Sequence, residues 1–173
     1  VTVSSDWSGV AFPLVAAVCT QSNVTITGLN FSDPQADKQI IDILIKMGAC
    51  IEKDTQNGTV KVCGGKPLLN DITIDMNDMP DALPALCIAA CYSSGKTTVT
   101  TLAHIRQKES DRVSVMTEEL TKCGAKIECS PDSMTIFGGN PIHGAEIDSR
   151  KDHRIAMAMA VCGMFCHGQM KIS

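Results

Sequence analysis

The chain has 173 residues, of which 44% are hydrophobic, enough to bury the core of one domain. Its net charge of −4 gives it no general basic surface, and an aromatic content of only 3% leaves few rings to stack on bases. These numbers argue against a nucleic-acid partner, so any anion would be bound by a local group of basic side chains.

Nine cysteines are many for this length, and none of them forms a Cys-x-x-Cys pair. Cys87 and Cys91, like Cys162 and Cys166, are four residues apart, a spacing that puts both side chains on one face of a helix. A structural zinc site usually needs four ligands, and no nearby histidine completes one. We therefore predict that these cysteines pack as small buried hydrophobic residues and that the chain binds no metal.

Free cysteines in this number are typical of a reducing compartment. No apolar run reaches the ~18–20 residues of a membrane span, and no signal peptide is evident. We therefore expect no membrane partner and a cytoplasmic location, or a plastid location if the source is a plant.

The elements predicted along the chain recur with a period of about 70 residues. The first copy begins with a strand, "VTVSS" (1–5), and a nearly uniformly apolar helix, "DWSGVAFPLVAAVC" (6–19), which should be buried on most sides. An alternating Thr/Val strand, "NVTITGL" (23–29), and an amphipathic helix within "DKQIIDILIKMGACIE" (37–52) follow. A hairpin-like pair of strands that includes "TVKVCGG" (59–65) closes the copy.

The second copy starts at the strand "DITIDM" (71–76) and repeats this order. It has an apolar helix in "MPDALPALCIAAC" (79–91), a strand in "KTTVTTL" (96–102) and an amphipathic helix in "ESDRVSVMTEELTKCGAKIE" (109–128). The strand "SMTIFGG" (133–139) closes it. Gly48 and Gly124 should end the two amphipathic helices, because glycine is favoured just after a last helical turn.

The third copy contains only the strand "AEIDS" (145–149), the apolar helix "DHRIAMAMAVCGMFCHG" (152–168) and "QMKIS" (169–173). We predict an α/β fold of repeated βαβαββ units with approximate three-fold symmetry, in one domain with units at about 1–65, 66–139 and a partial 140–173. The unfinished unit suggests a fragment with a less covered apolar helix, and exposed apolar surface favours self-association. The side chains expected to be less covered are Met157, Met159, Met164 and Phe165.

Two dense clusters of charge, "QKESDR" (107–112) and "KDHR" (151–154), stand just before apolar runs. Helix N-termini expose unpaired N–H groups and a partial positive charge, so several helix starts pointing into one cleft would bind an anion. Ordinary capping is the alternative, since Asp81 and Glu109 are also residue types that helix starts prefer. Capping does not account for Arg154, because a cation at a helix N-terminus opposes the dipole and needs an anionic partner.

The motifs "DMPDA", "KESDR", "KCGAKIE" and "DHRIAMA", in this order, resemble the 5-enolpyruvylshikimate-3-phosphate synthase family, and the similarity runs through essentially all 173 residues. The resemblance implies six βαβαββ units in two domains of three, an inside-out α/β barrel, with this chain covering most of the C-terminal half and the partner domain absent. It implies transfer of the enolpyruvyl group of phosphoenolpyruvate to the 5-hydroxyl of shikimate 3-phosphate, with release of phosphate, in the shikimate pathway to chorismate and the aromatic amino acids. The implied binding partners are these two substrates, with no metal and no cofactor.

The resemblance also implies roles for individual residues. Asp81 matches the aspartate that contacts the shikimate hydroxyls and is a candidate base. Lys108 matches the lysine near the reacting hydroxyl and is a candidate acid or base, and Glu109 matches the glutamate assigned to proton transfer at the methylene carbon. The residues that match groups binding phosphoenolpyruvate are Arg112, His153 and Arg154.

Two alternative functions share this fold. One is the sister enzyme that transfers enolpyruvyl to UDP-N-acetylglucosamine, which lacks the "KESDR" and "DHR" pattern. The other is a non-catalytic anion-binding domain. We expect the chain alone to be inactive, because the family's C-terminal lysine and its phosphate-binding partner domain are not in this sequence.

Overall fold

The computed structural model describes residues 5–173, so the strand expected at 1–5 lies, apart from Ser5, outside the described residues. Three helices occupy the centre: α1 (Trp7–Cys19), α3 (Leu83–Tyr92) and α5 (His153–Gly163). Two outer helices, α2 (Ile40–Met47) and α4 (Arg112–Lys122), are accompanied by the 3-10 turns η1 (Ala36–Gln39), η2 (Pro80–Ala82) and η3 (Ile105–Gln107). Within residues 5–173, no helix combines the length and the apolar character needed to cross a membrane.

Three sheets share one strand order, and this shared order supports the predicted repeat. The four-stranded sheet has the order β4 (Ile72–Asp75), β5 (Lys96–Thr100), β7 (Ser133–Phe137) and β6 (Lys126–Cys129). Its first pair is parallel and the others are antiparallel. The three-stranded sheet repeats the last three positions with β1 (Val24–Ile26), β3 (Thr59–Cys63) and β2 (Cys50–Asp54). The two-stranded sheet repeats the first pair with parallel β8 (Glu146–Ile147) and β9 (Lys171–Ile172).

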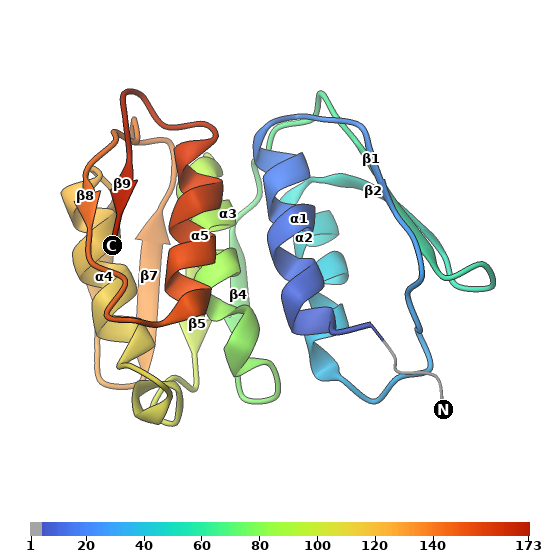
Figure 1. The fold of residues 1–173 in the computed structure, drawn as a ribbon, viewed down its shortest axis with the longest axis horizontal. Coiled ribbons are helices and arrows are strands. Elements are labelled where there is room, and N and C mark those ends of the chain that lie inside the picture. The colour runs from blue at the N-terminus through green and yellow to red at the C-terminus, as the bar shows by residue number, and fades with distance from the viewer. Residues whose placement is uncertain (1–4) are drawn as a thin grey trace.

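The parallel pairs explain the placement of the central helices. Parallel neighbours need a crossover connection, and α3 connects β4 to β5 just as α5 connects β8 to β9. The three central helices contact one another, and Figure 1 shows α1 and α5 running in the same direction with α3 between and behind them. Their N-terminal ends therefore meet at one end of the molecule, and the predicted α/β fold of repeated units is confirmed.

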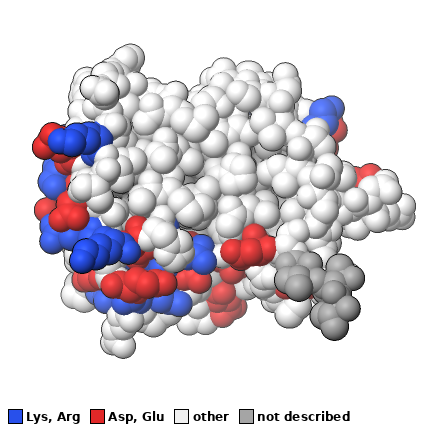
Figure 2. Space-filling model, in the orientation of Figure 1, with Lys and Arg blue, Asp and Glu red and all other residues white. Residues whose placement is uncertain are grey.

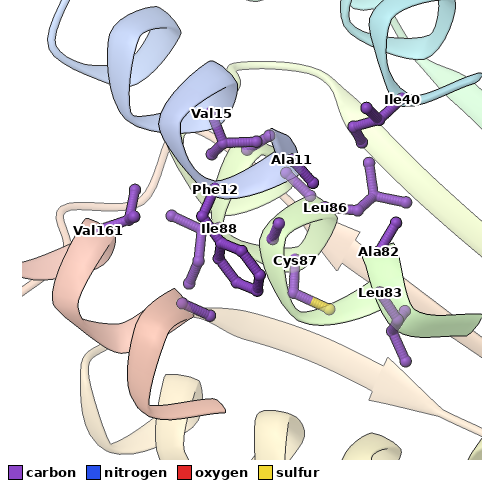
Figure 3. Packing of buried hydrophobic residues seen from close by; sticks show 14 of the residues in the cluster. Ala11, Phe12, Val15, Ile40, Ala82, Leu83, Leu86, Cys87, Ile88 and Val161 are labelled. Atoms are coloured by element: carbon purple, nitrogen blue, oxygen red, sulfur yellow. The ribbon is translucent and has the colours of Figure 1, made fainter. Parts of the chain in front are cut away.

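The core lies between the central helices, as their uniform apolar sequences predict. Nine of the ten residues of α3 are buried, because α3 is enclosed by its two neighbours and by the four-stranded sheet. Figure 3 shows Phe12 of α1, Ile88 of α3 and Val161 of α5 in one cluster. The outer helices end as predicted, with φ of 119° at Gly48 and 97° at Gly124, a backbone conformation that favours glycine.

The expectation for α5 is confirmed in part. Met157 and Met164 are 39% and 59% exposed, but Met159 is fully buried, so its expected exposure was wrong. The reason is helix geometry: Met159 lies one turn from Ile155 on the stripe that faces α1 and α3, whereas Met157 points away. Phe165 is partly covered, since its ring packs edge-on against Tyr92 at 5.4 Å between centroids.

This exposed side of α5 leads to a prediction about self-association. Figure 2 shows charged side chains along the lower and left margins of this face, whereas its centre, over α1 and α5, is formed by other residues. We expect the chain to self-associate, and the double change Met157→Gln and Met164→Gln to weaken the association about tenfold, because each methionine would bury apolar surface between copies. Sedimentation velocity over a range of concentrations measures this.

Leu69→Gln is the matched control, because Leu69 is also 59% exposed but lies outside α5. An equal effect of this change, or a chain that stays monomeric at every concentration, would contradict the prediction.

Candidate active site

The charged residues of both sequence clusters meet at the end of the molecule where the central helices begin. Arg112 is the first residue of α4, Asp152 is the N-cap of α5, and Asp81 lies in the 3-10 turn η2 just before α3. The helix packing thus joins three segments that are far apart in sequence. Figure 2 shows acidic and basic side chains intermingled along this margin.

Arg112 is the centre of the cluster, and its side chain is fully buried. Its Nε donates to Asp152 Oδ2 at 2.8 Å, its Nη1 donates to Asp81 Oδ1 at 2.7 Å, and its Nη2 donates to Glu109. Asp152 is also fully buried, whereas 51% of the Glu109 side chain is exposed. A buried guanidinium needs such partners, because an unpaired charge inside a protein is strongly destabilising.

Asp81 joins Arg112 to the two more exposed cations. Lys108 Nζ lies 3.5 Å from Asp81 Oδ1, and Arg154 Nη2 lies 3.6 Å from Asp81 Oδ2. These separations are longer than those of a strong charge-assisted hydrogen bond, so both cations are only loosely paired with Asp81. Together with Glu109 and Asp152, the cluster contains three cations and three carboxylates, and its formal charge is balanced.

A second set of contacts links the cluster to the start of α1. Arg154 Nη2 donates to Ser8 Oγ at 2.9 Å, and Ser8 Oγ donates to Asp6 Oδ1 at 2.6 Å. Asp6 caps α1 by accepting from the backbone N–H of Ser8 at 3.0 Å. The first helix therefore supplies Arg154 with an acceptor, and all three central helix starts take part in one hydrogen-bonded network.

The electrostatics keep the carboxylates of Asp81 and Asp152 ionised. Burial alone raises the pKa of Asp81, but the hydrogen bond from Arg112 and the charges of Arg154 and Lys108 outweigh it, and the pKa is lowered. Burial likewise raises the pKa of Asp152, while the hydrogen bond and charge of Arg112 bring it below its usual value. Asp81 is therefore a carboxylate at neutral pH and able to accept a proton.

Five of the six predicted site residues come together, and His153 does not join them. His153 lies in the first turn of α5 with its side chain exposed, and it makes no side-chain hydrogen bond or ion pair with any residue from 5 to 173.

The capping alternative is wrong for Asp81, whose carboxylate caps no helix and pairs with cations instead. The helix cap in the first charge cluster is Asp111, which accepts from the backbone N–H of Ser114 at 3.0 Å.

The sequence reasoning missed three participants. Asp152 was part of the "DHR" motif but received no role, because an Asp before a helix suggests only a cap. Ser110 Oγ donates to Asp152 Oδ2 at 3.1 Å, and Ser8 accepts from Arg154. The repeat offered one usable signal, since Asp6 and Asp152 occupy equivalent places before apolar helices.

The family model described as EPSP synthase (3-phosphoshikimate 1-carboxyvinyltransferase) matches residues 1–173. The chain belongs to the EPSP synthase family. A 3-phosphoshikimate 1-carboxyvinyltransferase of Ruminiclostridium cellulolyticum is 43% identical over 99% of this chain and 39% of its own length. One of Methanocella arvoryzae is 42% identical over 99% of this chain and 40% of its own length.

Solved structures agree with the sequence relatives. An EPSP synthase structure from Acinetobacter baumannii matches with a TM-score of 0.87 and 32% identity, over 98% of this chain and 42% of that protein. The chain therefore has the EPSP synthase fold but spans only about two fifths of the length of the relatives it matches. Within the described part of the chain, no group of three or more His, Cys, Asp or Glu side chains is arranged to hold a metal ion.

Proposed function

We propose that this chain supplies the enolpyruvyl-transfer residues of an EPSP synthase, which moves the enolpyruvyl group of phosphoenolpyruvate to the 5-hydroxyl of shikimate 3-phosphate and releases phosphate. The observation that carries the proposal is the meeting of Asp81, Lys108, Glu109, Arg112 and Arg154 in one cluster at three joined helix starts. Relatives named for this reaction support it and favour it over transfer to UDP-N-acetylglucosamine or a non-catalytic role.

The loosely held cations are the proposed binding groups for phosphoenolpyruvate. Lys108 and Arg154 are 35% and 14% exposed, and each lies at least 3.5 Å from Asp81, so an anion can take over their interactions at little cost. Arg112 is different, because it is fully buried and already bound by carboxylates. An anion reaches Arg112 only when Glu109, the most exposed of its partners, moves away. His153, exposed beside Arg154, is proposed to contact the substrate directly.

The carboxylates are the proposed proton carriers. The 5-hydroxyl oxygen attacks carbon 2 of phosphoenolpyruvate, and carbon 3 takes up a proton, which gives a tetrahedral intermediate; loss of that proton and of phosphate then forms the product. Asp81, ionised at neutral pH and beside Lys108, is the proposed base for the hydroxyl. Glu109, half exposed, takes up a proton from solvent in this proposal, donates it to carbon 3 and accepts a proton back from carbon 3 when phosphate leaves.

The proposal predicts no turnover by the chain alone and restored turnover in a complete enzyme. The chain spans about two fifths of its relatives, and each charge-assisted hydrogen bond that the remainder supplies to substrate contributes about 1.5–3 kcal/mol. Losing several of these bonds, together with closure around the substrates, should reduce phosphate release by more than about a thousandfold. We would measure phosphate release by the 173-residue chain and by a chimera in which it replaces the matching segment of the Ruminiclostridium cellulolyticum relative.

The unmodified relative is the positive control. A folded chimera that releases no phosphate while the relative is active would contradict the proposed function. Turnover by the chain alone at a rate near that of the relative would contradict the requirement for the remaining segments.

A further inference from the structure

We propose that Cys50 and Cys63 form a reversible disulfide across the β2–β3 hairpin, which makes this hairpin a site of thiol modification. The inference is independent of the proposed enzymatic function, because neither cysteine belongs to the charge cluster. It rests on strand register, which puts the two side chains on one face, and on their accessibility.

The strand register puts the two cysteines directly opposite each other. Cys50 begins β2, Cys63 ends β3, and the two are paired residues of an antiparallel ladder. Opposite residues in such a ladder point to the same face, with Cα atoms about 4.5 or 5.5 Å apart. Both separations lie within the range of about 4.4–6.8 Å that a disulfide requires. Because the two side chains also leave the ladder on the same face, closing the bond needs little backbone movement.

The second unit holds a different side-chain pair at the equivalent place. In the β6–β7 hairpin, Lys126 pairs with Phe137 at the same end of the ladder, and the Lys126 ammonium lies 4.8 Å from the Phe137 ring centroid. In both hairpins, therefore, the side chains at this cross-strand position can link the two strands at the same end of the ladder. A disulfide in the first unit would do the same with a covalent bond.

Accessibility separates this pair from the other close cysteines. Cys50 and Cys63 are both partly exposed, and β2 is an edge strand of its sheet. Cys87 and Cys91, in contrast, are buried in α3, and burial raises the pKa of Cys87 to about 12, which makes its thiol inert. Of the described cysteines, Cys129 alone is more exposed than this pair, but the residue opposite it in the ladder is Met134.

The charged neighbours of the pair are one carboxylate and one ammonium on the same hairpin face. Glu52 and Lys61 are the next pair along that face, and Lys61 Nζ lies 3.5 Å from Glu52 Oε2. Cys63 Sγ donates to Glu52 Oε1 at 3.8 Å. Burial, followed by the neighbouring Cys50 thiol, raises the pKa of Cys63. Because the thiolate is the reactive form, closure of the disulfide should become faster as pH rises.

The oxidant is a small disulfide such as oxidised glutathione. One protein thiolate attacks a sulfur of the small disulfide, forms a mixed disulfide and releases one thiolate, which takes up the displaced proton. The second protein thiol, after losing its proton, attacks the protein sulfur of the mixed disulfide, and the second small thiol leaves. Two protein thiols are oxidised to one disulfide while one small disulfide is reduced to two thiols.

The experiment incubates the 173-residue chain with oxidised glutathione, blocks the remaining thiols and digests the protein with trypsin and endoproteinase Asp-N without reduction, because trypsin does not cleave the Lys66–Pro67 bond. We expect the peptides "MGACIEK" (47–53) and "VCGGKPLLN" (62–70) to be recovered linked to each other, and glutathione to be recovered on Cys129. We also expect oxidation to raise Tm by about 5 °C, because the bond closes a short loop in the unfolded chain. Cys50→Ser should leave Cys63 as a glutathione adduct with no rise in Tm.

Cys129→Ser is the matched control, and it should leave the linked peptides and the rise in Tm unchanged. Separate glutathione adducts on Cys50 and Cys63 in the unmutated chain would overturn the proposal. So would two free thiols at a time when Cys129 has fully reacted, or a linkage from Cys63 to any cysteine other than Cys50.

Discussion

Replacing Asp152 by alanine is expected to lower the free energy of unfolding of the 173-residue chain by about 3–5 kcal/mol. The Arg112 and Asp152 side chains are both fully buried, and Arg112 Nε donates to Asp152 Oδ2 at 2.8 Å. Removing the carboxylate leaves a buried guanidinium without its most enclosed partner. It also removes the cap of α5, since Asp152 Oδ1 accepts from the backbone N–H of Arg154. Urea unfolding followed by circular dichroism measures the change.

The control for this prediction is Asp148→Ala. Asp148 pairs with Arg150 at 3.0 Å, but both side chains are about half exposed, and exposed pairs contribute little to stability. Its replacement should leave the free energy of unfolding nearly unchanged. Equal small losses for the two variants would mean that the buried pair is not a major source of stability.

Acid provides a second readout of the Asp152 variant. The folded protein holds the pKa of Asp152 below its unfolded value, because the Arg112 interactions outweigh burial. A carboxyl of this kind contributes stability that is present above its unfolded pKa, near 3.9, and lost as pH falls through the folded pKa. The unmutated chain should therefore lose stability below about pH 5, and Asp152→Ala should lose less over the same range.

The repeated pattern of elements made it possible to predict the fold from the sequence. Three apolar stretches without a polar face had to be buried against each other, and glycines with positive φ ended the outer helices at Gly48 and Gly124. Residue patterns within each segment were enough to predict these helices and where they end. They were not enough to predict the burial of Met159, which depends on which side of α5 faces α1 and α3.

The candidate site could be predicted only in part, because its contacts also depend on how distant segments pack together. The sequence motifs identified Asp81, Glu109 and Arg112, but the sequence contains no sign that Arg112 is fully buried or that its main partner lies 40 residues away. An Asp before a helix suggests a cap, and Asp152 is one, so its second role is hidden. For Asp81 the sequence suggested a helix cap that the structure does not contain. Asp81 precedes a helix but lies inside a 3-10 turn, so its carboxylate is directed to cations instead.

Asp81 and Arg154 should have separable effects in the chimeric enzyme. Asp81→Ala is expected to reduce kcat by about 10²–10⁴-fold, the usual contribution of a positioned base, with little change in KM for phosphoenolpyruvate. The structural reason is that Asp81 is a carboxylate among three cations, so its removal does not take a binding group away from an anion. Arg112 stays paired with Asp152 and Glu109, which should preserve the fold.

Arg154→Ala is expected to do the reverse and raise KM for phosphoenolpyruvate by about 10–100-fold, because one charge-assisted hydrogen bond contributes about 1.5–3 kcal/mol. Its side chain is 14% exposed and its partners are Ser8 and, at a longer distance, Asp81, so it is free to bind an incoming anion.

Asp78→Ala is the matched control for both variants. Asp78 is exposed three residues before Asp81 and lies outside the cluster, so kcat and KM should each change less than about twofold. Steady-state phosphate release at varied phosphoenolpyruvate gives kcat and KM separately. A loss of kcat for Arg154→Ala, with only a raised KM for Asp81→Ala, would reverse the roles assigned to the two residues and show that Asp81 binds substrate without taking its proton.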